Sequence, residues 1–471
     1  MTRRQFAAAL AASATLPASA QSRRTPTRGP LRQSERNPRY FADSTGKPIF
    51  LAGTHTWHNI QDSGLPPVPA FDWNAFLRLL ISHNHNFTRL WTWEQSALAP
   101  WTAERILFQP SIYQRTGPGL AQDGGLKFDL TKFNPAYFDR LRQRTDECRL
   151  NGIYAMVMLF QGFSVKRRRH CGDPWPAHPL NKANNINGLD GDRDGDHAYD
   201  LALPDVRRAN EDYMRKVVDT VGKFDNVMYE VINEGGNQDW DWWVVDTMHR
   251  IGKEQGLNCL TGLTGAGNET EEQMMASPAD FIASGGRGGI NKVDPPAWPG
   301  KKVNILDTDH IWGHGGTAAW VWKSLCRGYN TLLMDAWDPI AGKPCPTVNW
   351  AGGAGYPGRE VNTRDHFIWE PVRQAMGAAR RFAERFDLAA AVPSDEVSST
   401  RFCLAEPGVK YLAYLPEGDE VFLDLSAAKK ALKVEWNDPL GTRTVSGGDV
   451  EPATRVRLFV PFPGPAIVFL S

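Results

Sequence analysis

The chain has 471 residues, enough for two domains, and its 53 basic residues balance its 53 acidic residues. This balance excludes the strong positive field of a nucleic-acid binder or of a protein that binds an anionic membrane. The 17 tryptophans offer flat faces that stack on sugar rings, although tryptophan also fills ordinary protein cores.

The N-terminus has the features of an export signal. Arg3-Arg4-Gln5-Phe6 precedes an apolar run over residues 7–17 and the small-x-small site Ala18-Ser19-Ala20. The run is too short to remain in a bilayer as an anchor. We therefore expect residues 1–20 to be a twin-arginine signal peptide and the protein to be periplasmic or extracellular, without a membrane anchor. Residues 21–36 are rich in arginine and poor in apolar side chains, which predicts a disordered leader.

Apolar, strand-like runs alternate with amphipathic helical stretches from about residue 48 to 390. The eight expected strands are Ile49–Gly53, Phe87–Trp91, Tyr154–Phe160, Val227–Ile232, Leu260–Thr264, Phe281–Ala283, Val303–Leu306 and Thr331–Met334. The expected helices include Phe71–Ser82, Pro135–Asn151, Pro204–Phe224, Trp240–Gln255, Thr317–Arg327 and Asp365–Arg385. Continuous apolar strands are typical of parallel sheets covered on both faces. The alternation predicts an α/β fold, a (β/α)8 TIM barrel over residues 37–390.

The pattern changes after Asp387. Short β-like runs separated by Gly, Pro and Asp then follow: Phe402–Leu404, Lys410–Leu415, Val421–Leu425, Leu432–Trp436, Arg455–Phe459 and Ala466–Leu470. They predict a small, all-β, antiparallel sandwich domain over residues 398–471.

Carboxylates follow the fourth and the seventh expected strands. The fourth ends in Asn233-Glu234 and the seventh in Asp307-Thr308-Asp309, where both aspartates have the same parity. Barrel active sites lie at the carboxyl ends of the strands, and these two strands face each other across the barrel mouth. Two carboxylates that flank the scissile bond are the minimum for glycoside hydrolysis. The pattern favours Glu234 as general acid/base with Asp309, or alternatively Asp307, as nucleophile.

Other polar and aromatic residues gather at the same strand ends. Arg89 is expected to bind the nucleophile and lower its pKa, and Asn233 to hold a sugar hydroxyl. Eight further residues are expected to line the sugar subsite: His55, Trp57, Trp91, Trp93, Gln161, His310, Trp312 and Trp337.

These motifs resemble clan A glycoside hydrolases, whose mark is Asn-Glu after strand four. More closely, the chain resembles apiosidase-like bacterial proteins, often described as collagenase-associated or cellulase-like. The similar segments are Asn37-Pro38-Arg39-Tyr40-Phe41, Gly46-Lys47-Pro48, Gly53-Thr54-His55-Thr56-Trp57 and Asn86-Phe87-Thr88-Arg89-Leu90-Trp91. Their C-terminal module, labelled collagen-binding, resembles Val434-Glu435-Trp436-Asn437-Asp438-Pro439-Leu440-Gly441.

The resemblance implies an acid/base at Glu234 and a nucleophile at Asp309, where the family has Glu. Aspartate is one methylene shorter, which leaves retaining and inverting mechanisms both open. The expected partner is a poly- or oligosaccharide, with no organic cofactor. Two other hypotheses stay open: a non-catalytic carbohydrate- or matrix-binding protein, and a polysaccharide lyase that uses the basic run Lys166-Arg167-Arg168-Arg169-His170.

One acidic loop resembles a calcium-binding loop. Asp190, Asp192 and Asp194 have Asp-x-Asp-x-Asp-Gly spacing, but the twelfth position is Leu201 rather than Glu. A structural Ca²⁺ and a solvated acidic loop are the two interpretations.

The six cysteines have no zinc-type spacing. A bridge between Cys326 and Cys345 is conceivable in an oxidising compartment, and buried free thiols are the alternative.

Overall fold

The structure is a computed structural model that describes residues 25–165, 171–192, 195–265, 270–285, 290–337, 342, 345 and 368–471. The expected signal peptide and the basic run 166–170 lie outside these residues.

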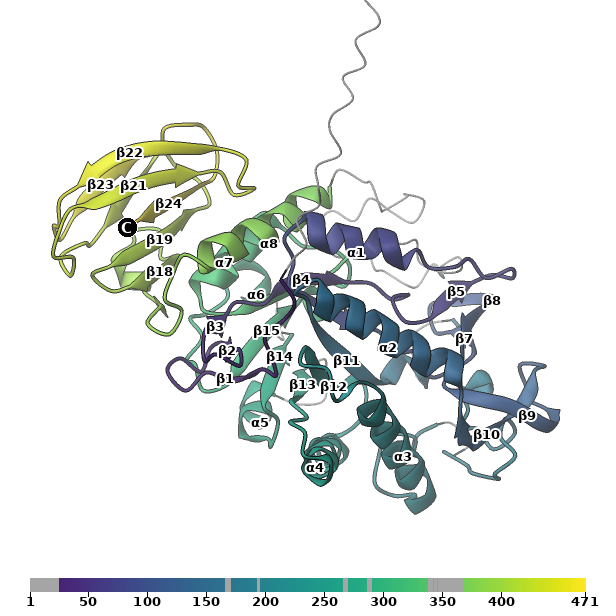
Figure 1. Cartoon of the computed structure of the whole chain (residues 1–471). Coiled ribbons are helices and arrows are strands. Elements are labelled where there is room, and N and C mark those ends of the chain that lie inside the picture. Colours follow the sequence, from purple (N-terminus) through teal and green to yellow (C-terminus); the bar gives the residue numbers. More distant parts are fainter. Residues whose placement is uncertain are drawn as a thin grey trace, which may run out of the picture.

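Eight parallel strands close into a barrel (Figure 1). In chain order they are β4 (Ala52–His55), β6 (Phe87–Leu90), β11 (Tyr154–Gln161), β12 (Val227–Asn233), β13 (Thr261–Gly265), β14 (Phe281–Ser284), β15 (Val303–Asp307) and β16 (Asn330–Met334). All eight expected strands are present, and β16 pairs with β4 to complete the ring. The (β/α)8 prediction is confirmed. The first strand begins later than expected because Pro48–Ile49 pairs with another strand instead.

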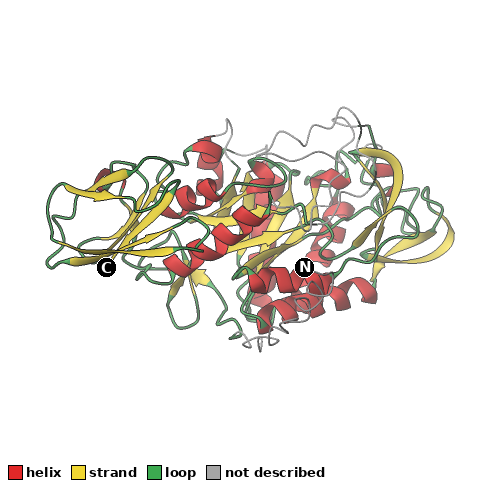
Figure 2. Cartoon of the chain, turned by 90° about the horizontal axis from the view of Figure 1, so that it is seen from above, coloured by secondary structure: helices red, strands yellow, loops and turns green. Residues whose placement is uncertain are grey.

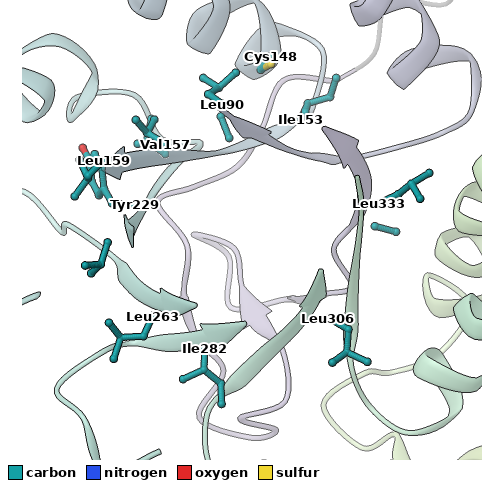
Figure 3. Packing of buried hydrophobic residues seen from close by; sticks show 14 of the residues in the cluster. Leu90, Cys148, Ile153, Val157, Leu159, Tyr229, Leu263, Ile282, Leu306 and Leu333 are labelled. Carbon is teal, nitrogen blue, oxygen red and sulfur yellow. The ribbon is translucent and has the colours of Figure 1, made fainter. Parts of the chain in front are cut away.

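Helices cover the outside of the barrel. They are α1 (Trp73–Ser82), α2 (Pro135–Leu150), α3 (Pro204–Val221), α4 (Gln238–Gln255), α5 (Glu271–Ala276), α6 (Ile290–Val293), α7 (Ala318–Cys326) and α8 (Glu370–Ala383). Outward apolar side chains of the strands, among them Leu90, Leu263 and Leu333, fill the space beneath the helices (Figure 3). In the described part of the chain, no helix combines the length and the apolar character needed to cross a bilayer.

A small N-terminal sheet precedes the first barrel strand and packs against the side chains inside the barrel. It consists of β1 (Arg32–Gln33), β2 (Phe41–Ala42) and β3 (Pro48–Ile49). Leu31 and Phe41 are buried with the side chains that fill the barrel interior, and the Thr27 hydroxyl donates to Asp225 at 2.6 Å. The expectation of a disordered leader is therefore wrong for residues 25–36, because one buried leucine and backbone pairing hold an otherwise polar segment in place.

An insertion after β6 adds strands that the apolar pattern did not predict. These strands are β7 (Ala97–Ala99), β8 (Thr102–Gln109), β9 (Tyr113–Leu120) and β10 (Leu126–Phe133). With β5 (Asp62–Gly64), β7 and β8 form a three-stranded sheet, and β9 pairs with β10. Buried and exposed residues alternate along most of β8, and β9 is mostly exposed or half-buried, so the apolar signal of the insertion is weak.

The C-terminal domain is the expected antiparallel β-domain. Its strands are β17 (Val392–Pro393), β18 (Cys403–Glu406), β19 (Lys410–Leu415), β20 (Glu420–Leu423), β21 (Leu432–Asn437), β22 (Thr444–Val450), β23 (Val456–Phe459) and β24 (Ala466–Leu470). Six form one sheet, in the order β17-β18-β19-β24-β21-β22, and β20 pairs with β23. The domain lies at one end of the molecule beside α7 and α8 (Figures 1 and 2).

The segment that resembles a collagen-binding motif holds this domain against the barrel. Glu435 forms a two-pronged ion pair with Arg385, with distances of 2.7 and 3.0 Å. The Pro439 carbonyl accepts a hydrogen bond from the Trp322 indole at 2.8 Å. Glu435 and Pro439 therefore have a structural role, which is to dock the C-terminal domain on the barrel.

A disulfide joins Cys171 to Cys345. The bridge between Cys326 and Cys345 that the sequence allowed does not form. Cys326 is a buried free thiol on α7, whereas Cys345 is bonded to Cys171, which follows β11 in the chain.

Candidate active site

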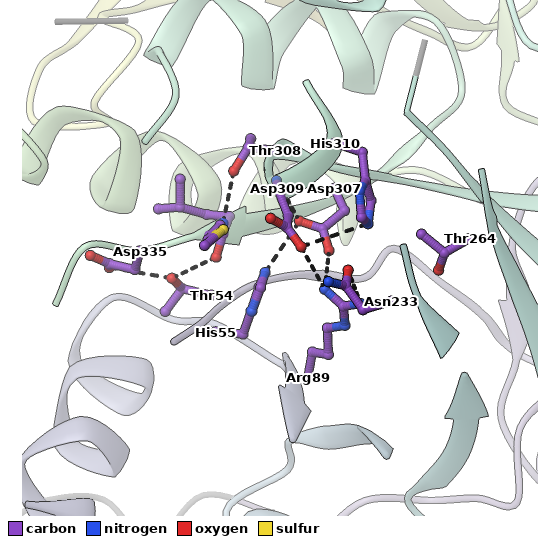
Figure 4. A network of polar contacts seen from close by, with 12 residues as sticks. Thr54, His55, Arg89, Asn233, Thr264, Asp307, Thr308, Asp309, His310 and Asp335 are labelled. Atoms are coloured by element: carbon purple, nitrogen blue, oxygen red, sulfur yellow. Dashed lines mark hydrogen bonds and ion pairs between the residues drawn. The ribbon is translucent and has the colours of Figure 1, made fainter. Parts of the chain in front are cut away.

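Arg89, on β6, is the centre of a buried ionic network at the carboxyl ends of the strands (Figure 4). Its guanidinium binds both oxygens of Glu230 on β12, at 2.5 and 2.6 Å. Nη1 also donates to Asp307 at 3.2 Å and to Asp309 at 3.1 Å. The Arg89 side chain has no exposed area. Burial alone would lower its pKa, but the three carboxylates raise it overall, so the guanidinium stays charged.

Asp307 lies at the base of this network. One oxygen accepts from the backbone N–H of Asp309 at 3.0 Å and lies 3.2 Å from Nε2 of His55. Burial would raise the pKa of Asp307, but His55 and Arg89 more than compensate and hold it well below its usual range. His55 in turn stacks on Trp91, with 5.5 Å between ring centroids. Asp307 is thus a fixed anion beneath the site.

Asp309 occupies the short 3₁₀ turn Thr308–His310 directly after β15. Its carboxylate lies 3.7 Å from Nε2 of His310. The pKa of Asp309 is raised: burial is the largest cause, and the negative charges of Asp307 and Glu234 add to it, whereas His310 and Arg89 oppose it. Asp309 is therefore the more readily protonated of the two aspartates.

Glu234 directly follows β12 in a left-handed backbone conformation, with φ of 48°. Such a conformation is costly for a residue with a side chain and is often found at functional sites. Two glycines let the chain pack closely at this turn: a Cβ on Gly162 would meet the Glu234 carbonyl at 2.1 Å, and a Cβ on Gly235 would meet Gly162 at 2.8 Å. The tight turn brings one Glu234 oxygen, one Asp309 oxygen and a ring nitrogen of His310 within 4.8 Å of one another.

Asn233 reaches the same network from the end of β12. Val231 and Ile232 both pack in the layer outside the barrel, so the strand alternation ends there and Asn233 turns inward. Its carbonyl oxygen accepts from Arg89 at 3.0 Å, and its amide nitrogen donates to Gln161 at 3.1 Å. Among the described residues these bonds use one of the two amide hydrogens of Asn233, so the other can be donated to a ligand.

A cavity of about 190 Å³ opens above these groups. Its lining residues are Trp57, Trp91, Trp93, Phe163, Asn233, Glu234, Asp309, Trp312, Gly313, His314 and Met334. Four expected tryptophans, Trp57, Trp91, Trp93 and Trp312, are among them. The cavity therefore joins an aromatic wall to two carboxylates.

Four other residues expected to line the subsite lie elsewhere. Trp337 packs between Phe71 and Phe76 beside α1, with 5.4 Å between ring centroids in each pair, because it points out of the barrel. His55 and Gln161 are fully buried beneath the cavity, where they hold Asp307 and Asn233. His310 lies beside Asp309, behind the lining residues.

Two buried carboxylates near the site were not predicted. Glu230 is the charged residue inside the apolar run Val227–Asn233, and a carboxylate in a strand buried on both faces requires a cationic partner. That signal points to Glu230. Glu94 is buried behind the site and accepts from the Tyr199 hydroxyl at 2.5 Å and from the Gln161 backbone at 2.8 Å. Burial raises its pKa to about 7.

The acidic loop supports a calcium site only weakly. Asp194 lies outside the described residues. Asp192 lies 3.7 Å from His197, which also contacts Asp200. Asp192 therefore already has the imidazole as a partner, and among the described residues neither Asp190 nor Asp192 belongs to a three-residue cluster that could hold a metal.

Comparison with known proteins identifies the fold. A family model described as a domain of unknown function (DUF6298) matches residues 106–279, which include Glu234 but neither Arg89 nor Asp309. No curated protein matches the chain. The structure is similar to a glycoside hydrolase family 5 protein from Bacteroides vulgatus ATCC 8482, with a TM-score of 0.63 and 13% identity over 95% of this chain and 94% of that chain. It is also similar to a structure called a glycoside hydrolase, with a TM-score of 0.56 and 13% identity over 95% and 98%. At this identity the likeness shows a common fold.

Proposed function

We propose that the protein is an exported glycoside hydrolase that cleaves a poly- or oligosaccharide with retention of configuration. The observation that carries this proposal is the approach of Glu234 and Asp309 to within 4.8 Å at the wall of one cavity. Retaining enzymes separate their two carboxyl groups by roughly 5–5.5 Å, and inverting enzymes by roughly 6.5–9.5 Å to admit a water molecule. An approach of single carboxylate oxygens to within 4.8 Å fits the retaining spacing, although aspartate is the shorter side chain.

In the first step Glu234, protonated, gives its proton to the glycosidic oxygen as that oxygen leaves the anomeric carbon. The Asp309 carboxylate attacks the same carbon and forms a glycosyl ester. In the second step the Glu234 carboxylate takes a proton from water, and the resulting hydroxide attacks the anomeric carbon. The ester bond breaks, which restores the Asp309 carboxylate and the Glu234 acid.

The surrounding residues fit this chemistry. Arg89 binds Asp309 and opposes the effect of burial on its pKa, which favours the ionised nucleophile. Asn233, held between Arg89 and Gln161, has one amide hydrogen to donate to a sugar hydroxyl. The cavity of about 190 Å³ is smaller than the ~300–1,000 Å³ of sites for drug-sized ligands, and it suits one sugar ring stacked on tryptophan.

The disulfide supports export. Structural disulfides persist in oxidising compartments and are rare in the cytosol. The Cys171–Cys345 bridge therefore agrees with the destination implied by the twin-arginine sequence.

The test is hydrolysis of a panel of glycans by the mature protein and by Glu234→Gln. The glutamine keeps the shape of the side chain but cannot donate the proton, so turnover should fall about 10²–10⁴-fold while sugar binding persists. Glu396→Gln, which changes an exposed carboxylate in the link to the C-terminal domain, should retain full activity.

Two results would support the rival hypotheses instead. Retarded migration in a glycan affinity gel, with no sugar released from any substrate, would indicate a binding protein. Products with near-ultraviolet absorption from a new carbon–carbon double bond would indicate a lyase.

A further inference from the structure

We propose that Glu234, Asp309 and His310 also form a binding site for a divalent cation of the zinc class, and that the bound ion blocks sugar hydrolysis. The site itself depends only on the geometry of these three residues. Its inhibitory effect rests on the proposed function, because the ion would occupy both reacting carboxylates.

The three side chains provide a suitable donor set. One oxygen of Glu234, one oxygen of Asp309 and one ring nitrogen of His310 all lie within 4.8 Å of one another. Two carboxylate oxygens and one imidazole nitrogen are typical zinc ligands, with bonds of about 2.0–2.2 Å. Side-chain rotations would shorten the gaps between the donor atoms, and the cavity would supply the fourth ligand as water.

His310 provides independent evidence for a ligand. Its side chain is 2% exposed, and among the described residues its Nε2 has no hydrogen-bond partner. A buried polar nitrogen without a partner loses its hydration, which is unfavourable unless a ligand replaces the water. Nε2 lies 3.7 Å from the Asp309 carboxylate and within 4.8 Å of Glu234, so its lone pair can complete the donor set.

The charges of the network favour a cation. In the described part of the chain, the Arg89 guanidinium pairs with the carboxylates of Glu230, Asp307 and Asp309. Three buried carboxylates around one guanidinium leave an excess of negative charge, which a divalent ion would offset. An uncompensated buried charge is costly, so this site attracts either protons or a metal ion.

The donor types select among metals. Mg²⁺ and Ca²⁺ prefer oxygen ligands only and larger coordination numbers. A site with one imidazole and an open position instead suits Zn²⁺, and also Co²⁺, which reports its coordination by visible absorption.

The experiment is calorimetric titration of ZnCl2 into untagged mature protein that has been treated with EDTA and dialysed. We expect one zinc ion per chain, no comparable binding of MgCl2, and visible absorption from bound Co²⁺. His310→Gln should weaken zinc binding at least about 100-fold, because it removes the nitrogen ligand. His249→Gln is the matched control, since His249 also lies beside a carboxylate, 2.8 Å from Asp280, but on the outer surface of α4.

Circular dichroism verifies the fold of each variant, and Glu234→Gln repeats the test if His310→Gln does not fold. Equal zinc affinity in wild type and in the variants of the site, or the absence of a zinc site of unit stoichiometry, would overturn the proposal. Undiminished glycan hydrolysis with zinc bound would also overturn it. By contrast, zinc binding that requires His310, together with no hydrolysis of any glycan in EDTA, would retain the metal site and reject the proposed hydrolase.

Discussion

Asp307 accepts a hydrogen bond from the backbone N–H of Asp309 at 3.0 Å. The two aspartates are two residues apart, yet this contact gives them different environments. Asp307 is held below the cavity by His55 and Arg89, whereas Asp309 lines the cavity. We infer that Asp307 fixes the turn that presents Asp309, and that Asp309 is the group that reacts.

Replacing Asp309 with alanine should therefore abolish turnover. If the enzyme retains configuration, azide should partly restore activity, because a small anion can enter the space left by the carboxylate and attack the anomeric carbon. The measurement is initial rate with and without azide, with product analysis for the glycosyl azide. A variant Asp309→Ala that turns over at the wild-type rate would exclude Asp309 as nucleophile.

Asp307→Ala should mainly reduce stability, because it leaves the backbone N–H of Asp309 and the His55 ring without their partner. One unsatisfied buried group costs about 1–3 kcal/mol in the free energy of unfolding, measurable by urea denaturation. If Asp307→Ala is fully stable, inactive and rescued by azide, the nucleophile is Asp307 instead.

The pH dependence of turnover should reflect the raised pKa of Asp309. The nucleophile must be ionised, so a raised pKa places the acid limb of kcat/KM at a higher pH than an ordinary aspartate would. In Asp307→Asn one negative neighbour is removed while an oxygen remains to accept the Asp309 N–H. The pKa of Asp309 should fall, and the acid limb should move to lower pH.

The control for Asp307→Asn is a variant that neutralises a carboxylate far from the site. Asp387→Asn is suitable, since Asp387 pairs with Arg36 on the surface, and it should leave the limb in place. Movement of the limb to higher pH in Asp307→Asn would contradict Asp309 as the titrating group.

The barrel was predictable from sequence because its strands are buried on both faces. Continuous apolar runs such as Tyr154–Gln161 and Val227–Asn233 stand out against the amphipathic helices, and each strand lies within a few residues of its expected position. The insertion after β6 was not predictable in this way, because β8 and β9 alternate or expose most of their residues.

The site was predictable where a side chain lies at the carboxyl end of a strand or directly after it. Glu234, Asp309 and Arg89 come together at the mouth of the barrel as the strand order requires. Residue types do not reveal which way a side chain points, so Trp337 was wrongly assigned to the subsite. Glu230 was missed because the apolar residues around it dominate the strand signal.

Replacing Glu230 with glutamine should destabilise the protein strongly. Arg89 would lose its two-pronged partner while remaining charged and fully buried. Removing one partner of a buried ion pair costs about 3–5 kcal/mol in the free energy of unfolding. Glu420→Gln breaks an exposed pair with Arg457 and should cost only about 0–1 kcal/mol. Equal stability losses for the two variants in urea denaturation would show that the Arg89–Glu230 pair is not a buried anchor.

Replacing both Cys171 and Cys345 with serine should weaken substrate binding more than it slows the chemical step. The bridge lies against the insertion after β6: the backbone N–H of Gly172, next to Cys171, donates to the Pro100 carbonyl at 3.0 Å, and that of Cys345 donates to the Trp101 carbonyl at 2.8 Å. Cys345 also packs in the aromatic cluster that lines the cavity. Without the bridge that wall loses support, while Glu234 and Asp309 keep their strand-end positions. We therefore expect KM to rise with kcat nearly unchanged.

The double variant should also lose about 2–4 kcal/mol of unfolding free energy, because the bridge closes a loop of 174 residues in the unfolded chain. Dithiothreitol should reproduce both effects in the wild type and add nothing to the double variant, since the four other described cysteines are free thiols. The measurements are KM and kcat on the glycan identified by the panel, and urea denaturation under oxidising and reducing conditions. An unchanged KM in a destabilised double variant would restrict the disulfide to a stabilising role and separate it from the sugar-binding wall.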